Sequence, residues 1–457
     1  MNRFGWVVIA TLLSVSAEAP FDSQHHAFGA VLLAQDKPTI VRLTLADAVN
    51  RGFETSHRLA EARAREAGAR AAARSVEVGK LPIVSVSGGY TRTNHVEEFA
   101  FPQPDGSRLV VYPDLPDNVV SRFGFQWPIY TSGRIDALER AAEAEVSAVA
   151  ADIEAARADL RFEIARAYWA AATAREAVRV LEESAARVQA QLNDANQRFK
   201  VGLIPPNEVF SLEAQRSREQ AQFIEARNLF EGALIDLKRL VGVDRGTVIE
   251  LTDLLERQYL ESKPLDASAL IKSALESRPE RQALSLRLGG LEARQSAARK
   301  GNLPTVSVLG GVDYANPNVR HFPRQGKVQR SWDVGVNFNW NFVDFGRTNA
   351  QVAEAAAALS AARERIAELD EVIAADVEQR LLDLQSSEAM VRAAADAIKS
   401  AAEARRIVGD RFNAGVATST DVLVAQVALL ESELARTRAL AAQRLAEARL
   451  ERSVGRW

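Results

Sequence analysis

Apolar residues recur at regular intervals along a long stretch of the chain, between Gly133 and Val201. From Leu160 onward their spacing alternates between four and three residues. This spacing is typical of a coiled-coil seam, which packs against other helices. At about 1.5 Å per residue, the stretch predicts a helix on the order of 100 Å long. The seam positions are Ile153, Leu160, Ile164, Ala167, Ala171, Ala174, Val178, Leu181, Ala185, Val188, Leu192, Ala195 and Phe199.

The chain contains an internal repeat of this pattern. Leu81-Pro82 recurs 222 positions later as Leu303-Pro304. Gly133-Arg134 recurs 213 positions later as Gly346-Arg347, and two constant offsets along one chain indicate a duplication. The other matches are Val84-Ser85-Val86 with Val306-Ser307-Val308, Gly88-Gly89 with Gly310-Gly311, Trp127 with Trp340, Arg198-Phe199 with Arg411-Phe412, Gly202 with Gly415 and Gly242 with Gly455.

We therefore predict repeat one over 43–242, a linker over 243–264 that lies halfway along the long helices, and repeat two over 265–455. In each repeat, the pattern of apolar residues predicts a first helix, two strands, the long helix and a return helix, in this order. The first helices are predicted over Leu45–Gly79 and Leu265–Lys300, and each is stopped by a Leu-Pro pair. The return helices are predicted over Asn207–Val241 and Thr420–Val454.

The second long helix carries the seam less regularly than the first. Arg380, Ser387 and Arg405 interrupt it at positions that are apolar in the first copy. We still predict a helix of the same length, because the remaining positions keep the coiled-coil spacing. These are Ile366, Ile373, Val377, Leu384, Val391, Ala394, Ile398, Ala401, Val408 and Phe412.

Strict alternation of apolar and polar residues marks the strands. The clearest case runs from Asp333 to Phe342, and Val84–Thr91 and Arg122–Trp127 show the same pattern. Loops rich in proline and glycine are predicted over Phe99–Asp117 and Ala315–Arg330. The apolar side of the clearest strand consists of Val334, Val336, Phe338, Trp340 and Phe342. The opposite side consists of Asp333, Gly335, Asn337, Asn339 and Asn341.

Strands of about ten residues with one apolar side are long enough to cross a bilayer in a tilted barrel. Four strands cannot close such a barrel, and lipid tolerates no open sheet edge. We therefore predict a mixed α and β membrane protein whose barrel is built from several copies of the chain. The alternative is a periplasmic or cytoplasmic coiled-coil scaffold whose strands form a small soluble sheet.

The N-terminus has the features of a secretory signal over residues 1–19. Arg3 supplies positive charge, Trp6–Val15 is largely apolar, and Ala17-Glu18-Ala19 fits the cleavage pattern. Pro20 is unfavourable directly after that site, so cleavage as late as Ala34 stays open. The alternative is a short apolar arm of a cytoplasmic protein.

Composition and the absence of known motifs exclude several kinds of site and function. The 457-residue chain has no cysteine, which excludes disulfides and thiolate metal sites. Its formal net charge of −3 gives no indication of nucleic-acid binding. No later segment has the 18 consecutive apolar residues of a transmembrane helix. No phosphate loop or nucleophile elbow is present, so we expect neither enzymatic activity nor a cofactor. The histidines show no metal-ligand spacing: His25, His26, His57, His95 and His321.

Two short motifs add a family resemblance to this pattern. Phe199-Lys200-Val201-Gly202 ends the first long helix, and Phe412-Asn413-Ala414-Gly415 ends the second, followed by Asp421-Val422-Leu423. Together with the duplicated order of elements, these resemble the TolC-type outer-membrane efflux family over essentially the whole mature chain. The resemblance implies a homotrimer, with a twelve-strand barrel in outer-membrane lipid above a helical tunnel in the periplasm. It also implies a passive exit channel that meets a periplasmic membrane-fusion adaptor and an inner-membrane pump of the RND, ABC or MFS type.

The turns at the far ends of the long helices are the candidate functional sites. In the family these tips meet the adaptor, which makes eight positions the adaptor-contact candidates. Read as structure alone, they are helical hairpin turns with a glycine C-cap, and Thr418–Asp421 resembles a capping box. The candidates are Arg198, Phe199, Gly202, Leu203, Arg411, Phe412, Gly415 and Val416.

Glu208 and Asp421 lie six residues after the two turn glycines. The resemblance implies that they line a periplasmic aperture that selects cations, where like charges would raise one another's pKa or recruit cations. The alternative for each is a carboxylate that stabilises a helix N-terminus. The sequence departs from the family at Val424, where a second acidic residue is expected, and at Ala417, where a basic residue is expected.

Three aromatic residues lie where the strands meet the helices. Trp127, Tyr130 and Trp340 are candidates for an aromatic belt at the membrane interface. The alternative is simple packing between the strands and the helices.

Overall fold

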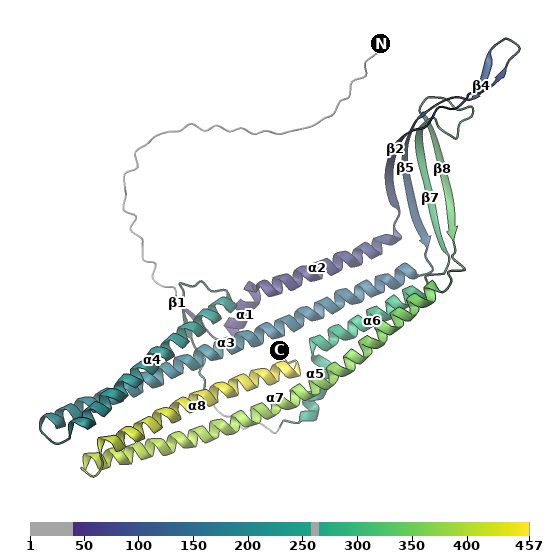
Figure 1. Cartoon of the computed structure of the whole chain (residues 1–457). Helices are drawn as coiled ribbons and strands as arrows, with labels where there is room; N and C mark the ends of the chain where they lie inside the picture. The colour runs from purple at the N-terminus through teal and green to yellow at the C-terminus, as the bar shows by residue number, and fades with distance from the viewer. Residues whose placement is uncertain (1–39, 257–264, 457) are drawn as a thin grey trace, which may run out of the picture. The chain divides into compact units, whose positions relative to one another are not determined.

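The computed structural model describes residues 40–256 and 265–456, and these described residues belong to one unit by their internal contacts. The predicted signal lies outside the described residues. Figure 1 shows the long helices, shorter helices packed alongside them, and the main sheet, whose strands continue from the helix ends. The elements are β1 (Ile40–Leu43), α1 (Leu45–Thr55), α2 (His57–Glu77), the 3-10 turn η1 (Val78–Lys80), β2 (Ile83–Arg92), β3 (Phe99–Pro102), β4 (Arg108–Tyr112), β5 (Asp117–Tyr130), α3 (Arg134–Lys200), α4 (Pro206–Val241), β6 (Val248–Leu251), α5 (Ala267–Ser277), α6 (Pro279–Arg299), β7 (Thr305–Asn316), β8 (Gln329–Asn339), α7 (Arg347–Asn413) and α8 (Ser419–Val454).

The long helices α3 and α7 have 67 residues each, and the return helices α4 and α8 have 36 residues each. The seam predicted for α3 is confirmed, because most of its positions are buried against neighbouring helices. Ala174, Val178 and Ala185 are half-buried, and Phe199 is exposed at the tip. The buried positions are Ile153, Leu160, Ile164, Ala167, Ala171, Leu181, Val188, Leu192 and Ala195.

Two of the three polar residues that interrupt the second seam form bonds within α7. Arg380 pairs with Asp376 at 3.1 Å and with Asp383 at 2.9 Å, within α7 itself. The Ser387 hydroxyl is buried and donates to the Leu384 carbonyl at 2.7 Å. These two side chains therefore find partners on their own helix, whereas the buried Nε of the third residue, Arg405, has no hydrogen-bond partner among the described residues. The helix α7 continues through all three positions.

The first helix of each repeat is divided into two helices, so the prediction of a continuous helix was wrong in both repeats. Between α1 and α2, Ser56 takes an extended conformation and its side chain accepts from the Leu59 N–H, which starts a new helix. Between α5 and α6, Arg278 is extended because Pro279 excludes the helical conformation from the residue before it.

The main sheet is antiparallel and has the strand order β2-β5-β7-β8, so β2 and β8 form its two edges. Two sequence expectations need correction. The loop predicted over Phe99–Asp117 contains the β3–β4 hairpin, in which Phe99 and Phe101 are in edge-to-face contact. The strand predicted to reach Phe342 ends at Asn339, because Trp340 has no partner in the β7–β8 register.

The linker between the repeats also contains a strand that was not predicted. β6 pairs in parallel with β1, far away in sequence. The buried Tyr168 of α3 joins both segments, because its hydroxyl donates to the Leu43 carbonyl at 3.0 Å and accepts from the Asp253 N–H at 3.1 Å. Burial raises the pKa of this phenol to about 12.

The helices repeat the lateral order of the strands. Near the strands the contacts run α2–α3–α6–α7, and beyond the linker they run α4–α3–α8–α7. Pairs such as Arg287 with Asp152 and Arg187 with Glu433 place α6 on the first half of α3 and α8 on its second half. One side of the chain therefore presents β2, α2 and α4, and the other presents β8 and α7.

Candidate functional site

The two hairpin turns at the far ends of α3 and α7 have the same backbone geometry. In the first, Gly202 has φ +77° and its N–H donates to the Phe199 carbonyl, while the Leu203 N–H donates to the Arg198 carbonyl. In the second, Gly415 has φ +74°, and the residues at the equivalent positions make the same two bonds. Both turns are Schellman motifs, in which the left-handed residue is glycine because it has no Cβ. The four bonds use eight residues, which are the eight predicted adaptor-contact positions: Arg198, Phe199, Gly202, Leu203, Arg411, Phe412, Gly415 and Val416.

The return helices begin in two different ways. α4 begins with Pro206, directly after Pro205, where a missing N–H costs nothing. α8 begins with the capping box that the sequence predicted: the Thr418 side chain accepts from the Asp421 N–H, and the Asp421 carboxylate accepts from the Thr418 N–H at 2.8 Å. The bonds from Thr418 hold the pKa of the Asp421 carboxyl below its usual range.

The two tips of one chain contact each other through side chains. The Arg198 guanidinium lies over the Phe412 ring, with Cζ 4.6 Å from the ring centroid. The Ser419 hydroxyl of α8 donates to the Glu208 carboxylate of α4. Leu423 of α8 packs among the residues of the first hairpin, in a cluster with Leu192, Ala195, Val209 and Leu212.

These contacts give the two predicted aperture carboxylates different environments. Glu208 accepts across the tip contact from Ser419, whereas Asp421 is bound within its own cap. In the single chain, the hydrogen bonds from Thr418 lower the pKa of Asp421. The capping alternative therefore describes Asp421 in the single chain, and an aperture role for both residues stays a prediction.

The tips also expose apolar side chains. Phe199, Leu203 and Val416 are exposed, as the adaptor prediction requires. Sequence reasoning missed two exposed neighbours, Val201 and Phe210, although both are apolar residues outside the buried seam. Val424, the departure from the family pattern, is also exposed.

The predicted belt residues lie at the end of the sheet that adjoins the helices. The Trp127 indole N–H donates to the Lys80 carbonyl at 3.0 Å, and Tyr130 is the last residue of β5. Trp340 contacts Phe342 with ring centroids 5.9 Å apart. Sequence reasoning missed Phe345, which is 99% exposed with φ +51° in the turn before α7. Its repeat equivalent, Ser132, also has φ +51°, and this backbone likeness could not be read from two different residues.

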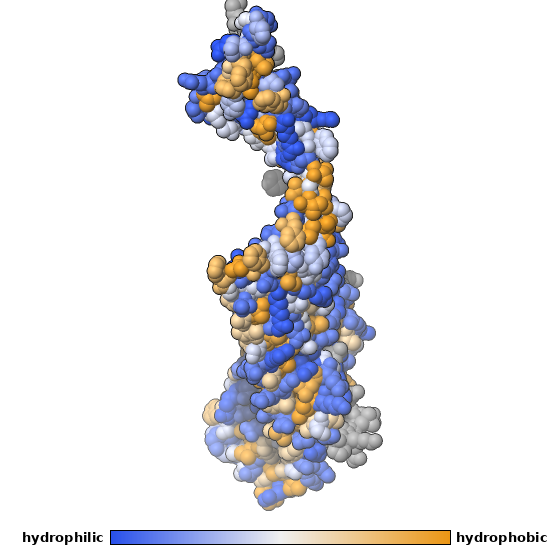
Figure 2. All heavy atoms as spheres, turned by 90° about the vertical axis from the view of Figure 1, so that its right-hand side faces the viewer, coloured by the Kyte–Doolittle hydropathy of each residue, from blue (hydrophilic) through white to orange (hydrophobic). Residues whose placement is uncertain are grey.

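The sheet has one apolar and one polar face. Cross-strand pairs such as Val86 with Phe123, and Val308 with Val336, lie on one face. Figure 2 shows hydrophobic residues gathered over the strands and at their junction with the helices. On the other face, Arg122 of β5 bonds Asp313 of β7 at 2.8 Å and Asp333 of β8 at 2.9 Å.

Within the described residues, no group of three or more His, Cys, Asp or Glu side chains is arranged to hold a metal ion. In the same part of the chain, none of the helices combines the length and the apolar character needed to cross a membrane.

Comparisons with known proteins by sequence and by structure both find outer membrane proteins. The chain is 26% identical over 280 residues to outer membrane protein TolC of Escherichia coli strain K12, which spans 57% of this chain and 55% of that protein. It is 25% identical over 386 residues to outer membrane protein TolC of Vibrio cholerae, which spans 83% of each. The chain thus spans little more than half the length of the first relative.

Solved structures share the fold. The outer membrane protein VceC of Vibrio cholerae matches with a TM-score of 0.73 at 20% identity, over 90% of this chain and 96% of that one. The Campylobacter jejuni CmeC outer membrane channel matches with a TM-score of 0.71 at 18% identity, over 96% and 94%. A sequence model of the outer membrane efflux protein family matches residues 49–243 and 270–456. These matches cover both repeats, and the chain belongs to the outer membrane efflux protein family.

Proposed function

We propose that this protein is the outer-membrane exit channel of a tripartite export system, a passive conduit across the periplasm and the outer membrane. The observation that carries the proposal is the four-stranded sheet, which has one apolar face, one polar face and two unpaired edges. Family membership supports the same function.

The open edges call for further copies of the chain. β2 and β8 have one strand partner each, and lipid supplies no hydrogen bonds for the groups left over. Because β2, α2 and α4 lie on one side and β8 and α7 on the other, a ring of copies would close the strands and the helices together. Three copies give twelve strands, enough for a barrel that continues into a helical tunnel.

The two faces of the sheet fit the two sides of such a barrel. The face with Val86, Phe123 and Val336 would meet lipid. The face with Arg122, Asp313 and Asp333 would line a water-filled bore, where its ion pairs stay hydrated. Trp127, Tyr130 and Trp340 would then lie at the periplasmic membrane interface, where indole and phenol groups are favoured.

The helix tips are the proposed meeting point with a periplasmic membrane-fusion adaptor, which would link the channel to an inner-membrane pump of the RND, ABC or MFS type. The exposed apolar residues Leu203 and Val416 offer the contact surface. Replacing both with Asp should reduce export and adaptor crosslinking while leaving assembly intact. Leu254→Asp, an exposed apolar position in the linker, is the matched control.

Fractionation and conductance test the channel itself. We expect the protein in the outer-membrane fraction, soluble only with detergent, and forming ion-conducting pores in planar bilayers. A protein that stays in the soluble fraction without detergent and conducts no ions would instead be the coiled-coil scaffold. Co-purification of crosslinked partners from intact cells would identify the pump and the adaptor.

A further inference from the structure

A recess lies between three helices partway along α3, where α4 and α8 both pack against it. Its volume is about 620 Å³. The space is free because many of the lining side chains are small, among them Ala170, Ala174 and Ala177 of α3 and Ala441 of α8. Leucines from all three helices complete an apolar lining.

The recess lies on the side of α3 that is turned away from the β1–β6 sheet. Tyr168 hydrogen-bonds to the backbone of β1 and of the linker, and the Arg175 guanidinium donates to the Leu251 carbonyl of β6. Tyr168 and Arg175 are seven positions apart, so they lie on one face of the helix. Ala170 and Ala177 follow them by two positions each, which is a rotation of about 200° around the helix axis.

A passive conduit requires the β1–β6 sheet to lie outside the ring of helices. Twelve helix columns at a spacing of about 9 Å form a ring about 35 Å across, with a bore about 25 Å wide. The helix α1 and the β1–β6 sheet pack together against α3, and one helix alone is about 10 Å thick. Three such layers inside the bore would block it. The opposite side of α3, with the recess, therefore faces the bore in the proposed channel.

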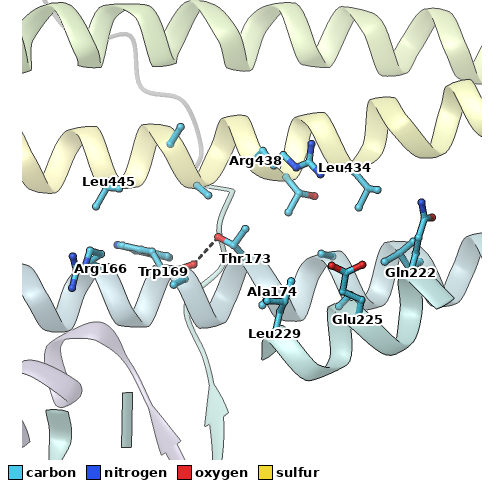
Figure 3. Close-up of a pocket in the computed structure, with 17 residues that line it drawn as sticks. Arg166, Trp169, Thr173, Ala174, Gln222, Glu225, Leu229, Leu434, Arg438 and Leu445 are labelled. Carbon is cyan, nitrogen blue, oxygen red and sulfur yellow. Dashed lines mark hydrogen bonds between the residues drawn. The ribbon is translucent and has the colours of Figure 1, made fainter. Parts of the chain in front are cut away.

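The charged groups around the recess are unevenly distributed. Figure 3 shows Arg166 and Trp169 toward one end, Arg438 nearer the middle and Glu225 toward the other end. Within the described part of the chain, none of these three charged side chains forms an ion pair. The Arg444 guanidinium lies over the Trp169 ring, with Cζ 5.1 Å from the centroid, and holds the indole in place. The part of the recess beside Trp169 therefore combines an aromatic ring with two positive charges that lack a counter-ion.

We propose that the recess binds amphipathic anions in the wall of the tunnel, one in each copy of the chain. The aromatic or alicyclic body of such a molecule would lie against the alanines and leucines, and its carboxylate or sulfonate would lie between Arg166 and Arg438. Guanidinium groups form charge-assisted bonds with such oxyanions, and these bonds are stronger than those between neutral groups. The inference rests on the proposed channel and adds to it a site that holds a molecule in transit.

The recess has the size of a site for a small organic molecule. From Arg166 to Leu181 the lining extends over fifteen residues of α3, or about 22 Å. Its volume of about 620 Å³ lies within the range of about 300–1,000 Å³ that is typical of small-molecule sites, which also have a mostly apolar lining with few polar groups. An elongated ligand with its charge near one end matches this distribution.

The second repeat replaces the residues that line the recess. At the positions 213 residues later, Leu382 replaces Trp169, Asp383 replaces Ala170 and Met390 replaces Ala177. A long helix of the same length thus forms with larger or charged side chains at these positions. Helix packing alone does not require the small residues of α3, and ligand binding gives a separate reason for them.

Titration with anilinonaphthalene sulfonate (ANS), an amphipathic anion whose fluorescence rises in apolar sites, tests the recess. We would use the assembled channel in lipid nanodiscs and subtract the signal of nanodiscs without protein. Ala174→Phe fills the recess and should weaken ANS binding on the order of tenfold. Arg166→Gln and Arg438→Gln should each weaken it to a similar extent, because each removes a charge-assisted bond. The uncharged analogue phenylnaphthylamine should lose affinity only in Ala174→Phe.

Two variants serve as matched controls. Ala186→Phe adds the same ring to the same helix, at an exposed position five turns after Tyr168 and thus on the side away from the recess. Arg227→Gln removes a positive charge from an exposed position on α4 that does not line the recess. Both should bind ANS as the native chain does. Equal weakening in a control and its test variant, or unchanged affinity in both arginine variants, would overturn the site even if Ala174→Phe failed to assemble.

Conductance tests whether the recess faces the bore. ANS should lower the single-channel current of the native protein in planar bilayers, and it should have a smaller effect on Arg438→Gln. ANS binding without any change in current would contradict the position in the tunnel wall. In each of these outcomes the protein still conducts ions, whereas a failure of the channel proposal would leave no current to measure.

Discussion

Arg198 at the tip of α3 lies over the ring of Phe412 at the tip of α7, with Cζ 4.6 Å from the ring centroid. Both turns carry the same Arg-Phe pair, because Arg198-Phe199 of repeat one corresponds to Arg411-Phe412 of repeat two. The contact therefore joins the cation of one turn to the aromatic residue of the other, at the proposed mouth of the channel. A cation–π contact of this kind contributes about 0.5–1 kcal/mol at an exposed site.

Removing this contact should loosen the mouth. We expect Arg198→Ala and Phe412→Leu each to raise single-channel conductance in planar bilayers, with the double variant adding little to either. Arg406→Ala is the matched control, because Arg406 forms ion pairs with Glu403 and Asp410 of its own helix. Fully additive effects of the two tip substitutions would show that the residues act separately.

Replacing Glu208 and Asp421 with Ala should weaken cation selectivity, because a trimer would lose six carboxylates near one axis. Asp421→Ala also removes the helix cap, so Thr418→Ala serves as a control that weakens the cap and keeps the charge. Reversal potentials measured in a salt gradient give the selectivity directly. An unchanged reversal potential in the double Ala variant would remove both residues from the aperture.

The cap of α8 should depend on pH. Because the folded pKa of Asp421 is depressed, its contribution to stability is present above the unfolded value of about 3.9 and is lost as pH falls through the folded value. We expect the protection of the Asp421 and Val422 amides against hydrogen exchange to fall below about pH 4. Asp421→Asn should lose this pH dependence. Constant protection of the native residue down to pH 2 would contradict the assignment.

A charge pair can be transferred from the interface inside the chain to the one proposed between chains. Arg187 of α3 pairs with Glu433 of α8 at 2.9 Å, and the equivalents are Ser400 on α7 and Gln220 on α4, both exposed. Ser400→Arg with Gln220→Glu should raise the temperature at which trimers dissociate, because the new ion pair would stabilise each interface by up to about 1 kcal/mol.

The matched control for this transfer is Ser400→Arg with Gln220→Arg, which should lower the dissociation temperature. The same temperature for both variants would show that these positions do not meet in the assembled protein.

The sequence was sufficient to predict elements with regular local patterns. The α3 seam, the alternation in β8 and the capping box at Thr418 are all encoded within a few residues. The break at Arg278 could also have been predicted, because Pro279 restricts the residue before it. The break at Ser56 depends on a side-chain cap that competes with a helix pattern continuing on both sides.

Long-range contacts could not be predicted in this way. The pairing of β1 with β6, the bond between Ser419 and Glu208, and the position of Arg198 over Phe412 join residues about 210 positions apart. Nothing in the local sequence specifies which polar group will face which. The exposure of Phe345 needed the structure as well, because its turn replaces Ser132 of repeat one with a bulky residue.

The central claim is that several copies of this chain close one barrel, and the mass of the particle extracted from the outer membrane tests it most directly. Native mass spectrometry in detergent should give three copies of the mature chain in one complex. A single copy, stable in aqueous buffer without detergent, would contradict the account.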